Sequence, residues 1–217
     1  MGEARKHWEK VYTSKKPSEV SWYQPHLDIS LELIARSGTT QNDHIIDVGG
    51  GASTLIDDLL NRGFRNLSVL DISPRAIDVT RRRLGNRCVL VEWIEESVLR
   101  APLHKGAYRL WHDRAVFHFL TEPEDRQKYI QQLRHALSPG GAAVISTFSP
   151  EGPLRCSGLD VCRYSAQTLR EELGTGFRLV ESRPENHLTP SGTTQAFLYC
   201  LFRYEKENPP PHSVGVR

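Results

Sequence analysis

Acidic residues and glycines stand in this chain at spacings that could bind a nucleotide-like ligand. An apolar run at residues 45–48 is followed by three consecutive glycines: Gly49, Gly50 and Gly51. A leucine- and isoleucine-rich helical pattern comes next, so the segment predicts a strand, a tight turn and a helix. Such a turn lets a ligand approach the backbone and offers it the free N–H groups of a helix N-terminus. Asp71 lies about 20 residues beyond the glycines, where a carboxylate can accept both hydroxyls of a ribose.

Two cofactors use a turn of this kind. A dinucleotide site needs G-x-G-x-x-G, and Thr54 stands here at the third glycine position. Asp47, at the end of the predicted strand, would repel a pyrophosphate. It suits instead the positively charged amino-acid head of S-adenosylmethionine (SAM). Both features favour SAM over NAD. The remaining alternative is a purely steric turn, with Asp71 serving only to cap a helix that begins at Pro74.

Strand and helix patterns alternate along the rest of the chain. Strands are expected at about 44–48, 67–71, 88–94, 107–111, 142–148, 177–182 and 196–204. Helices are expected at about 4–12, 26–36, 53–62, 74–84, 124–137 and 166–173. The alternation predicts an α/β fold with a doubly wound, Rossmann-like, mostly parallel seven-stranded sheet. The last two strands are joined without a helix, so the final strand should run antiparallel. Ligands of such sheets bind at the carboxyl ends of the strands, which places the glycine turn and both acids in one crevice.

The chain divides into three predicted parts. Residues 1–38 form an N-terminal helical arm or lid, residues 39–206 form the ligand-binding domain, and residues 207–217, with three successive prolines, form a disordered tail. The arm carries Trp8, Trp22 and Tyr23. Aromatic residues on such a segment can cover a ligand, with Trp22 as a cofactor contact, or simply anchor the arm to the domain.

Composition narrows the classes of partner. The formal net charge is +2 with charges of both signs mixed, which argues against nucleic acid and anionic membranes as partners. No secretory signal or membrane-spanning run is visible. The four cysteines are scattered without a C-x-x-C pair, which indicates a reducing, cytoplasmic location. No spacing of His, Cys, Asp and Glu resembles a metal site.

Beyond these inferences, the chain resembles the class I (seven-β-strand) SAM-dependent methyltransferases from Trp8 to Tyr204. Residues 47–53 match the first motif of that family, and residues 137–141 are similar to its signature before strand five. The resemblance implies that Asp71, with Ile72 beside it, contacts the ribose. It also implies that Ser97 and Val98 flank the adenine, with Ser97 in place of the usual acid.

A narrower resemblance concerns the methyl acceptor. Residues 111–115 and 123–129 are partly similar to the thiopurine, thiol and halide methyltransferases, which implies a small-molecule acceptor with a soft, thiol-like nucleophile. A thiolate needs no general base. An amine or hydroxyl would need one, and His112 and Asp113, expected just after the fourth strand, are the candidates. Asp113 could instead contact the SAM amino group or pair with Arg114. Arg114 and Arg155 could attract an anionic substrate or be ordinary surface residues, and His118 is more simply a packing residue.

The leading hypothesis is therefore a SAM-dependent methyltransferase that acts on a small molecule. A protein-lysine methyltransferase of the same fold and a non-catalytic SAM-binding protein are the alternatives. An NAD-dependent oxidoreductase is disfavoured by Asp47 and Thr54.

Overall fold

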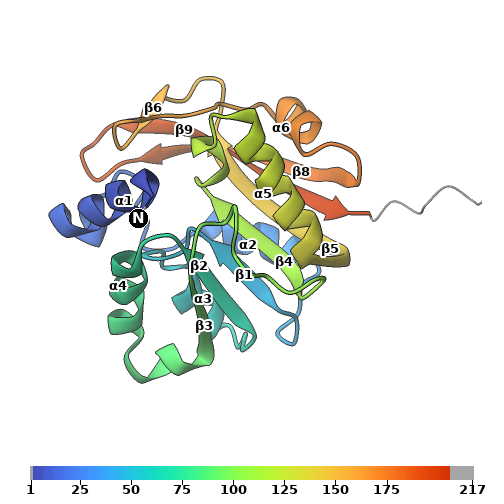
Figure 1. The fold of residues 1–217 in the computed structure, drawn as a ribbon, viewed down its shortest axis with the longest axis horizontal. Coiled ribbons are helices and arrows are strands. Elements are labelled where there is room, and N and C mark those ends of the chain that lie inside the picture. The colour runs from blue at the N-terminus through green and yellow to red at the C-terminus, as the bar shows by residue number, and fades with distance from the viewer. Residues whose placement is uncertain (1, 206–217) are drawn as a thin grey trace, which may run out of the picture.

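Seven strands form one twisted sheet in the computed structural model, which describes residues 2–205 (Figure 1). The strands are β1 (Ile45–Val48), β2 (Leu67–Asp71), β3 (Val91–Glu95), β4 (Tyr108–Arg114), β5 (Leu137–Phe148), β8 (Phe177–Leu188) and β9 (Thr194–Tyr204). Their order is β3-β2-β1-β4-β5-β9-β8, and β9 runs antiparallel to both of its neighbours, β5 and β8. The predicted fold is thus confirmed. The predicted tail of residues 207–217 lies outside the described residues.

Helices cover both faces of this sheet. They are α1 (Glu3–Ser14), α2 (Asp28–Arg36), α3 (Leu55–Asn61), α4 (Pro74–Leu84), α5 (Pro123–Ala136) and α6 (Ala166–Leu173), with short 3-10 turns η1 (Pro17–Glu19), η2 (Gly85–Leu90) and η3 (Phe117–Phe119). Side chains alternate along a strand, so Ile45 packs in the core under α2 and α3, whereas Ile46 packs in the core under α5 and α6. Each face of the sheet therefore has its own apolar layer.

The order of the strands reverses between β1 and β4. From β1 the chain proceeds outward through β2 to β3, and then returns to add β4 on the other side of β1. Loops that leave the carboxyl ends of β1 and β4 therefore run to opposite sides and leave a crevice between them. The glycine turn follows β1 directly, so it lies at this crevice.

Four strand boundaries differ from the sequence-based expectation by more than two residues, among them the start of β5 at Leu137 and the end of β8 at Leu188. β4 continues past Trp111 to Arg114 because it is paired on both sides, with Asp113 opposite Val48 of β1 and Ile145 of β5. β3 begins only at Val91, since the preceding residues form the 3-10 turn η2. The extension of β4 makes His112 and Asp113 strand residues, which must point to opposite faces of the sheet.

The N-terminal segment is attached to the domain at defined points. α1 lies beside α4 (Figure 1). Glu9 of α1 accepts hydrogen bonds from the Ser73 hydroxyl (2.6 Å) and the Arg75 backbone N–H (3.2 Å). Ser73 also caps α4 by accepting from the Ala76 N–H. The arm is thus held at the N-terminus of the helix that follows Asp71.

α2 falls within the predicted arm, yet it packs into the core through Leu31 and Ile34. The division at residue 38 therefore stays a prediction, and the part of the chain that lies at the crevice is α1 with the segment after it. Within residues 2–205, no helix combines the length and the apolar character needed to cross a membrane.

Candidate active site

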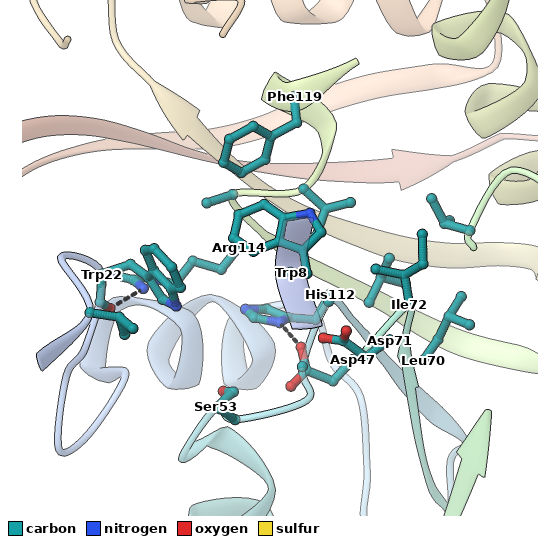
Figure 2. Close-up of a pocket in the computed structure, with 18 of the residues that line it drawn as sticks. Trp8, Trp22, Asp47, Ser53, Leu70, Asp71, Ile72, His112, Arg114 and Phe119 are labelled. Carbon is teal, nitrogen blue, oxygen red and sulfur yellow. Dashed lines mark hydrogen bonds and ion pairs between the residues drawn. The ribbon is translucent and has the colours of Figure 1, made fainter. Parts of the chain in front are cut away.

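A cavity of about 310 Å³ lies at the carboxyl ends of β1 to β4, in the size range of small-molecule sites (Figure 2). Most of the predicted cofactor contacts line it: Trp22, Asp47, Gly49, Gly50, Asp71, Ile72, Ser97 and Val98. His112 lines it as well, whereas Gly51 and Asp113 do not. The structure therefore brings the predicted residues of β1, β2 and the turn after β3 into one site.

Asp47 is held in place by His112. The Asp47 carboxylate can only accept, so His112 Nδ1 donates to Asp47 Oδ1 at 2.7 Å (Figure 2). His112 Nε2 meets the Ser30 hydroxyl at 2.9 Å. All three side chains are buried. Within residues 2–205 the second carboxylate oxygen, Oδ2, is buried without a hydrogen-bond partner. An unpaired buried carboxylate oxygen is costly, so the site is suited to a ligand that brings a donor.

The three glycines are required by different neighbours. Gly49 has a φ of 70°, and a Cβ there would collide with the side chain of Val116. A Cβ on Gly50 would collide with the Asp47 carboxylate. Gly51 donates its N–H to Asp71 at 3.0 Å, and a Cβ there would lie 2.6 Å from the same oxygen. Because Gly50 and Gly51 lack a Cβ, the carboxylates of Asp47 and Asp71 can pack directly against the backbone of the turn.

Asp71 presents a fixed carboxylate at the end of β2. Its Oδ1 accepts from the Ser73 N–H at 2.7 Å and its Oδ2 from the Gly51 N–H at 3.0 Å. A carboxylate has about four lone-pair sites, so each oxygen retains capacity for another donor. Burial raises the pKa of Asp71 to about 6, against the effect of these two backbone hydrogen bonds, and the nearby carboxylates of Asp47 and Glu9 add to the rise.

The turn after β3 supplies the third predicted group. Val98 is buried, and the Ser97 hydroxyl accepts from the Leu99 N–H at 3.3 Å. Glu96 also lines the cavity and accepts from the Ser97 N–H at 2.7 Å and from Arg100. Sequence reasoning did not single out Glu96, although an acid next to Ser97 was the available signal.

Asp113 requires a correction. From the sequence it was expected beside the ligand, but its side chain turns to the α5 face of the sheet. Oδ1 accepts from the Val116 N–H (2.8 Å), and Oδ2 accepts from the Phe117 N–H (3.1 Å) and the Tyr129 hydroxyl (2.5 Å). Burial raises the pKa of Asp113 to about 6. Asp113 is a buried acceptor that orders the turn after β4, and its separation from His112 follows from strand alternation.

Aromatic side chains form the wall on the arm side. Trp22 meets Trp8 and Tyr12 edge-to-face, with ring centroids 5.8 and 6.4 Å apart, and Trp8 meets Phe119 at 5.0 Å. These perpendicular arrangements are favoured by aromatic quadrupoles. All four residues line the cavity. Trp22 was expected there, whereas Tyr12 and Phe119 were not singled out as site residues.

A small hairpin formed by β6 (Arg155–Cys156) and β7 (Leu159–Asp160) closes another side. Its central residues, Ser157 and Gly158, have φ angles of 49° and 81°, as in a tight hairpin turn. Cys156 and Leu159 line the cavity. Sequence reasoning missed this hairpin, although a Ser-Gly pair is a turn signal. Burial raises the pKa of the Cys156 thiol to about 11, so it is protonated at neutral pH.

The family model described as "Methyltransferase domain" matches residues 45–141, which include the glycine turn, Asp71 and the turn after β3. A solved 1,6-didemethyltoxoflavin-N1-methyltransferase of Burkholderia thailandensis, with its substrate and S-adenosylhomocysteine (SAH) bound, has a TM-score of 0.67 at 19% identity and covers 94% of this chain and 84% of that one. Residues 45–141 thus match a methyltransferase domain, within the fold of the SAM-dependent methyltransferases. SAM is the cofactor that this match indicates.

Two relatives that are similar in sequence share one name. EEF1A lysine methyltransferase 2 of Danio rerio is 24% identical over 163 residues, covering 71% of this chain and 63% of the relative. The Homo sapiens protein of the same name is 20% identical over 198 residues, covering 83% of this chain and 76% of the relative. The chain thus spans less than two thirds of the length of the Danio rerio relative.

A further solved structure concerns the conversion of a disulfide bond into a thioacetal group during echinomycin biosynthesis. It has a TM-score of 0.74 at 18% identity and covers 94% of both chains.

The cavity of the methyltransferase domain fits SAM on its own chemistry. Within residues 2–205, Asp47 offers an unpaired buried oxygen, Asp71 offers two fixed oxygens at the end of the neighbouring strand β2, and the glycines leave the backbone open. In the part of the chain that the structure describes, no group of three or more His, Cys, Asp and Glu side chains is arranged to hold a metal ion.

Proposed function

We propose that the protein transfers the methyl group of SAM to a small molecule through a soft, thiol-like nucleophile. The observation that carries this proposal is the single cavity in which the unpaired oxygen of Asp47, the carboxylate of Asp71 and an aromatic wall meet. When bound, SAM supplies an electrophilic methyl group on a sulfonium centre, which the acceptor attacks from the side opposite the sulfur.

The proposed roles of the residues follow the order of the strands. Asp71 accepts from the ribose hydroxyls, and Ser97 and Val98 flank the adenine on the β2–β3 side. Asp47 accepts from the ammonium group at β1. The half of the cavity next to β4, lined by Phe119, Cys156 and Leu159, is then left for the acceptor.

The nucleophile is inferred from the groups around that half. Both ring nitrogens of His112 hold hydrogen bonds, and the Asp113 carboxylate lies on the other face of the sheet. His118 is buried, which lowers its pKa to about 3, and it does not line the cavity. None of the histidine and aspartate residues around the end of β4 is placed as a general base. A thiol needs no general base, because it is already partly ionised to the thiolate near neutral pH.

The aromatic wall would serve the transfer in two ways. Trp8, Trp22 and Phe119 exclude water from the reacting groups, and their ring faces can stabilise a nearby cation by about 0.5–2 kcal/mol. Holding donor and acceptor in line contributes up to roughly 7–11 kcal/mol to lowering the barrier of such a reaction.

The second candidate is a protein-lysine methyltransferase. It is favoured by the names of the Danio rerio and Homo sapiens relatives, which are EEF1A lysine methyltransferases. The toxoflavin N1-methyltransferase and the structure concerned with a disulfide and a thioacetal group favour a small molecule, the latter with sulfur as the reacting atom. A non-catalytic SAM-binding protein is the third candidate.

We also propose a reducing, cytoplasmic location, because the cysteines Cys88, Cys156, Cys162 and Cys200 are free thiols.

An acceptor screen with tritiated SAM separates these candidates. The panel contains aromatic and aliphatic thiols, matched amines and carboxylates, and purified eEF1A. We expect label transfer to thiols in preference to the matched amines, and loss of transfer in the Asp71→Ala variant, which cannot hold the ribose. Label on a lysine of eEF1A alone would support the second candidate. Tight SAM binding without transfer to any member would support the third, and no SAM binding would overturn the proposal.

A further inference from the structure

Two buried side-chain atoms at the cavity lack a hydrogen-bond partner within residues 2–205. They are Asp47 Oδ2 and Arg114 Nη2, and both residues line the cavity. The other buried atoms without a partner belong to residues that do not line it. One of the two atoms is an acceptor on a negatively charged group and the other is a donor on a positively charged group. Because orphaned buried polar atoms are rare and costly, an unpaired couple at one cavity points to a ligand.

Arg114 is held rigidly by its other two nitrogens. Nε donates to the Tyr199 hydroxyl at 2.8 Å, and Nη1 donates to the Trp22 carbonyl at 2.7 Å. The guanidinium carbon also lies 5.1 Å from the centre of the Phe197 ring. In Figure 2 the side chain extends toward Trp22. Both hydrogen-bond partners are neutral oxygens, so these contacts orient the guanidinium while its charge remains available to a ligand.

The positions of the two groups follow from strand pairing. Asp47 of β1 is paired with His112 of β4, and Arg114 lies two residues further along β4 on the same face. The two charged side chains therefore lie on neighbouring strands, on either side of the point where the strand order reverses. A ligand between them meets a negative group on one side and a positive group on the other.

We propose that Asp47 and Arg114 form a clamp for a zwitterionic amino-acid group. Asp47 Oδ2 accepts from the ammonium, and Arg114 Nη2 donates to the carboxylate. The amino-acid head of SAM carries both groups, and with that source the inference rests on the proposed function. An amino-acid acceptor has the same chemistry and is the second source. A peptide lysine, which brings an amine without a neighbouring carboxylate, would leave Arg114 unpaired.

A cycle that combines a protein variant with a ligand change tests the clamp. Isothermal titration measures the affinity of SAH and of its decarboxylated analogue for the wild-type protein, Arg114→Gln and Arg114→Lys. We expect removal of the carboxylate to weaken binding to the wild type by about 10- to 100-fold, the range for a charge-assisted hydrogen bond, and to have little effect in Arg114→Gln. The comparison is made within each variant, so a general loosening of the site cancels.

Arg155→Gln is the matched control, because Arg155 is an exposed arginine that pairs with Asp160 on the outer hairpin and does not line the cavity. It should behave as the wild type does. A second arm titrates the SAH-saturated proteins with L-cysteine and cysteamine, which differ only in the carboxylate.

Coupling of Arg114 to the SAH carboxylate supports the clamp with the donor as its occupant, and coupling only to the cysteine carboxylate supports it with the acceptor as its occupant. Wild-type binding of SAH without coupling in either arm overturns the clamp while leaving the proposed function intact. Failure of the wild type to bind SAH at all, or equal SAH binding by Asp71→Ala, would instead overturn the proposed function.

Discussion

The position of the Asp47 carboxylate is set by its immediate neighbours. One of its oxygens is fixed by His112, itself fixed by Ser30, and the other lies beside Gly50 without a hydrogen-bond partner within residues 2–205. A histidine that looked like a candidate base thus serves to orient a carboxylate. The position of this carboxylate also requires glycine at residue 50, because a Cβ there would collide with it.

The substitution Gly50→Ala tests that dependence. Its Cβ would collide with the Asp47 carboxylate and displace it, so we expect SAH affinity to fall by about tenfold or more, as for loss of a charge-assisted hydrogen bond. Titration calorimetry measures the affinity, and circular dichroism checks that the fold is retained. Gly38→Ala is the control: its φ of 77° makes alanine strained, but its Cβ would meet open space. It should lower stability and leave the affinity unchanged.

Asp71 should make cofactor binding depend on pH. Burial raises its pKa to about 6, and ribose hydroxyls donate to the charged form, so binding favours the deprotonated carboxylate. The affinity for SAH should therefore be full above pH 7 and decrease as the pH falls through 6, by up to about tenfold between pH 6 and 5. In Asp71→Asn the affinity should be weaker and lack this step. A wild-type affinity that is constant from pH 5 to 7 would contradict the proposed ribose contact.

Among the secondary-structure elements, β4 decides which side chains reach the cavity. Its extension to Arg114 sends His112 and Arg114 to the α2 face and Asp113 to the α5 face. On the α5 face, the Tyr129 hydroxyl donates to Asp113 at 2.5 Å and accepts from the Trp111 indole N–H at 2.9 Å. The two faces of one strand thus carry a ligand site and a structural hydrogen-bond chain.

Tyr129→Phe separates these two roles. The change leaves a buried Asp113 oxygen with one donor fewer and the Trp111 N–H unpaired, so the free energy of unfolding should fall by about 1–3 kcal/mol. SAH affinity should be unchanged, because the network faces away from the cavity. Urea unfolding and calorimetry measure the two quantities. Tyr204→Phe is the control, since Tyr204 stacks on Phe177 at 5.1 Å and lies outside this network. A loss of SAH affinity in Tyr129→Phe would restore Asp113 as a cofactor contact.

At the scale of the whole molecule, the cavity is closed by segments that are far apart in the chain. The glycine turn comes from the sheet, the aromatic wall from α1 and the segment after it, and a further side from the β6–β7 hairpin. Glu9 ties α1 to Ser73, whose N–H in turn holds Asp71. The predicted cofactor contact Asp71 and the position of the arm are therefore linked through the start of α4.

Deletion of residues 1–23 should impair function more than folding. It removes Trp8, Tyr12 and Trp22 from the cavity wall and leaves the sheet and both of its helical layers in place. We expect SAH affinity and turnover to fall by at least about tenfold while thermal unfolding stays cooperative, with a Tm only several degrees lower. Hydrogen exchange of the full chain should show the α1 amides protected by SAH. A shortened protein with full turnover would contradict a covering role for the arm.

The sequence by itself determined the alternation of strands and helices, the antiparallel final strand, the glycine turn and the acids at the ends of β1 and β2. These features are encoded locally, in hydrophobic periodicity, in glycine runs and in residues next to strand ends. Only the tertiary structure decided that β4 continues to Arg114, because that length comes from pairing with β1 and β5. It also decided that Asp113 turns away, that Phe119 and the β6–β7 hairpin reach the cavity, and that one nitrogen of Arg114 has no partner within residues 2–205. Each of these depends on contacts between residues distant in sequence, which no local pattern records.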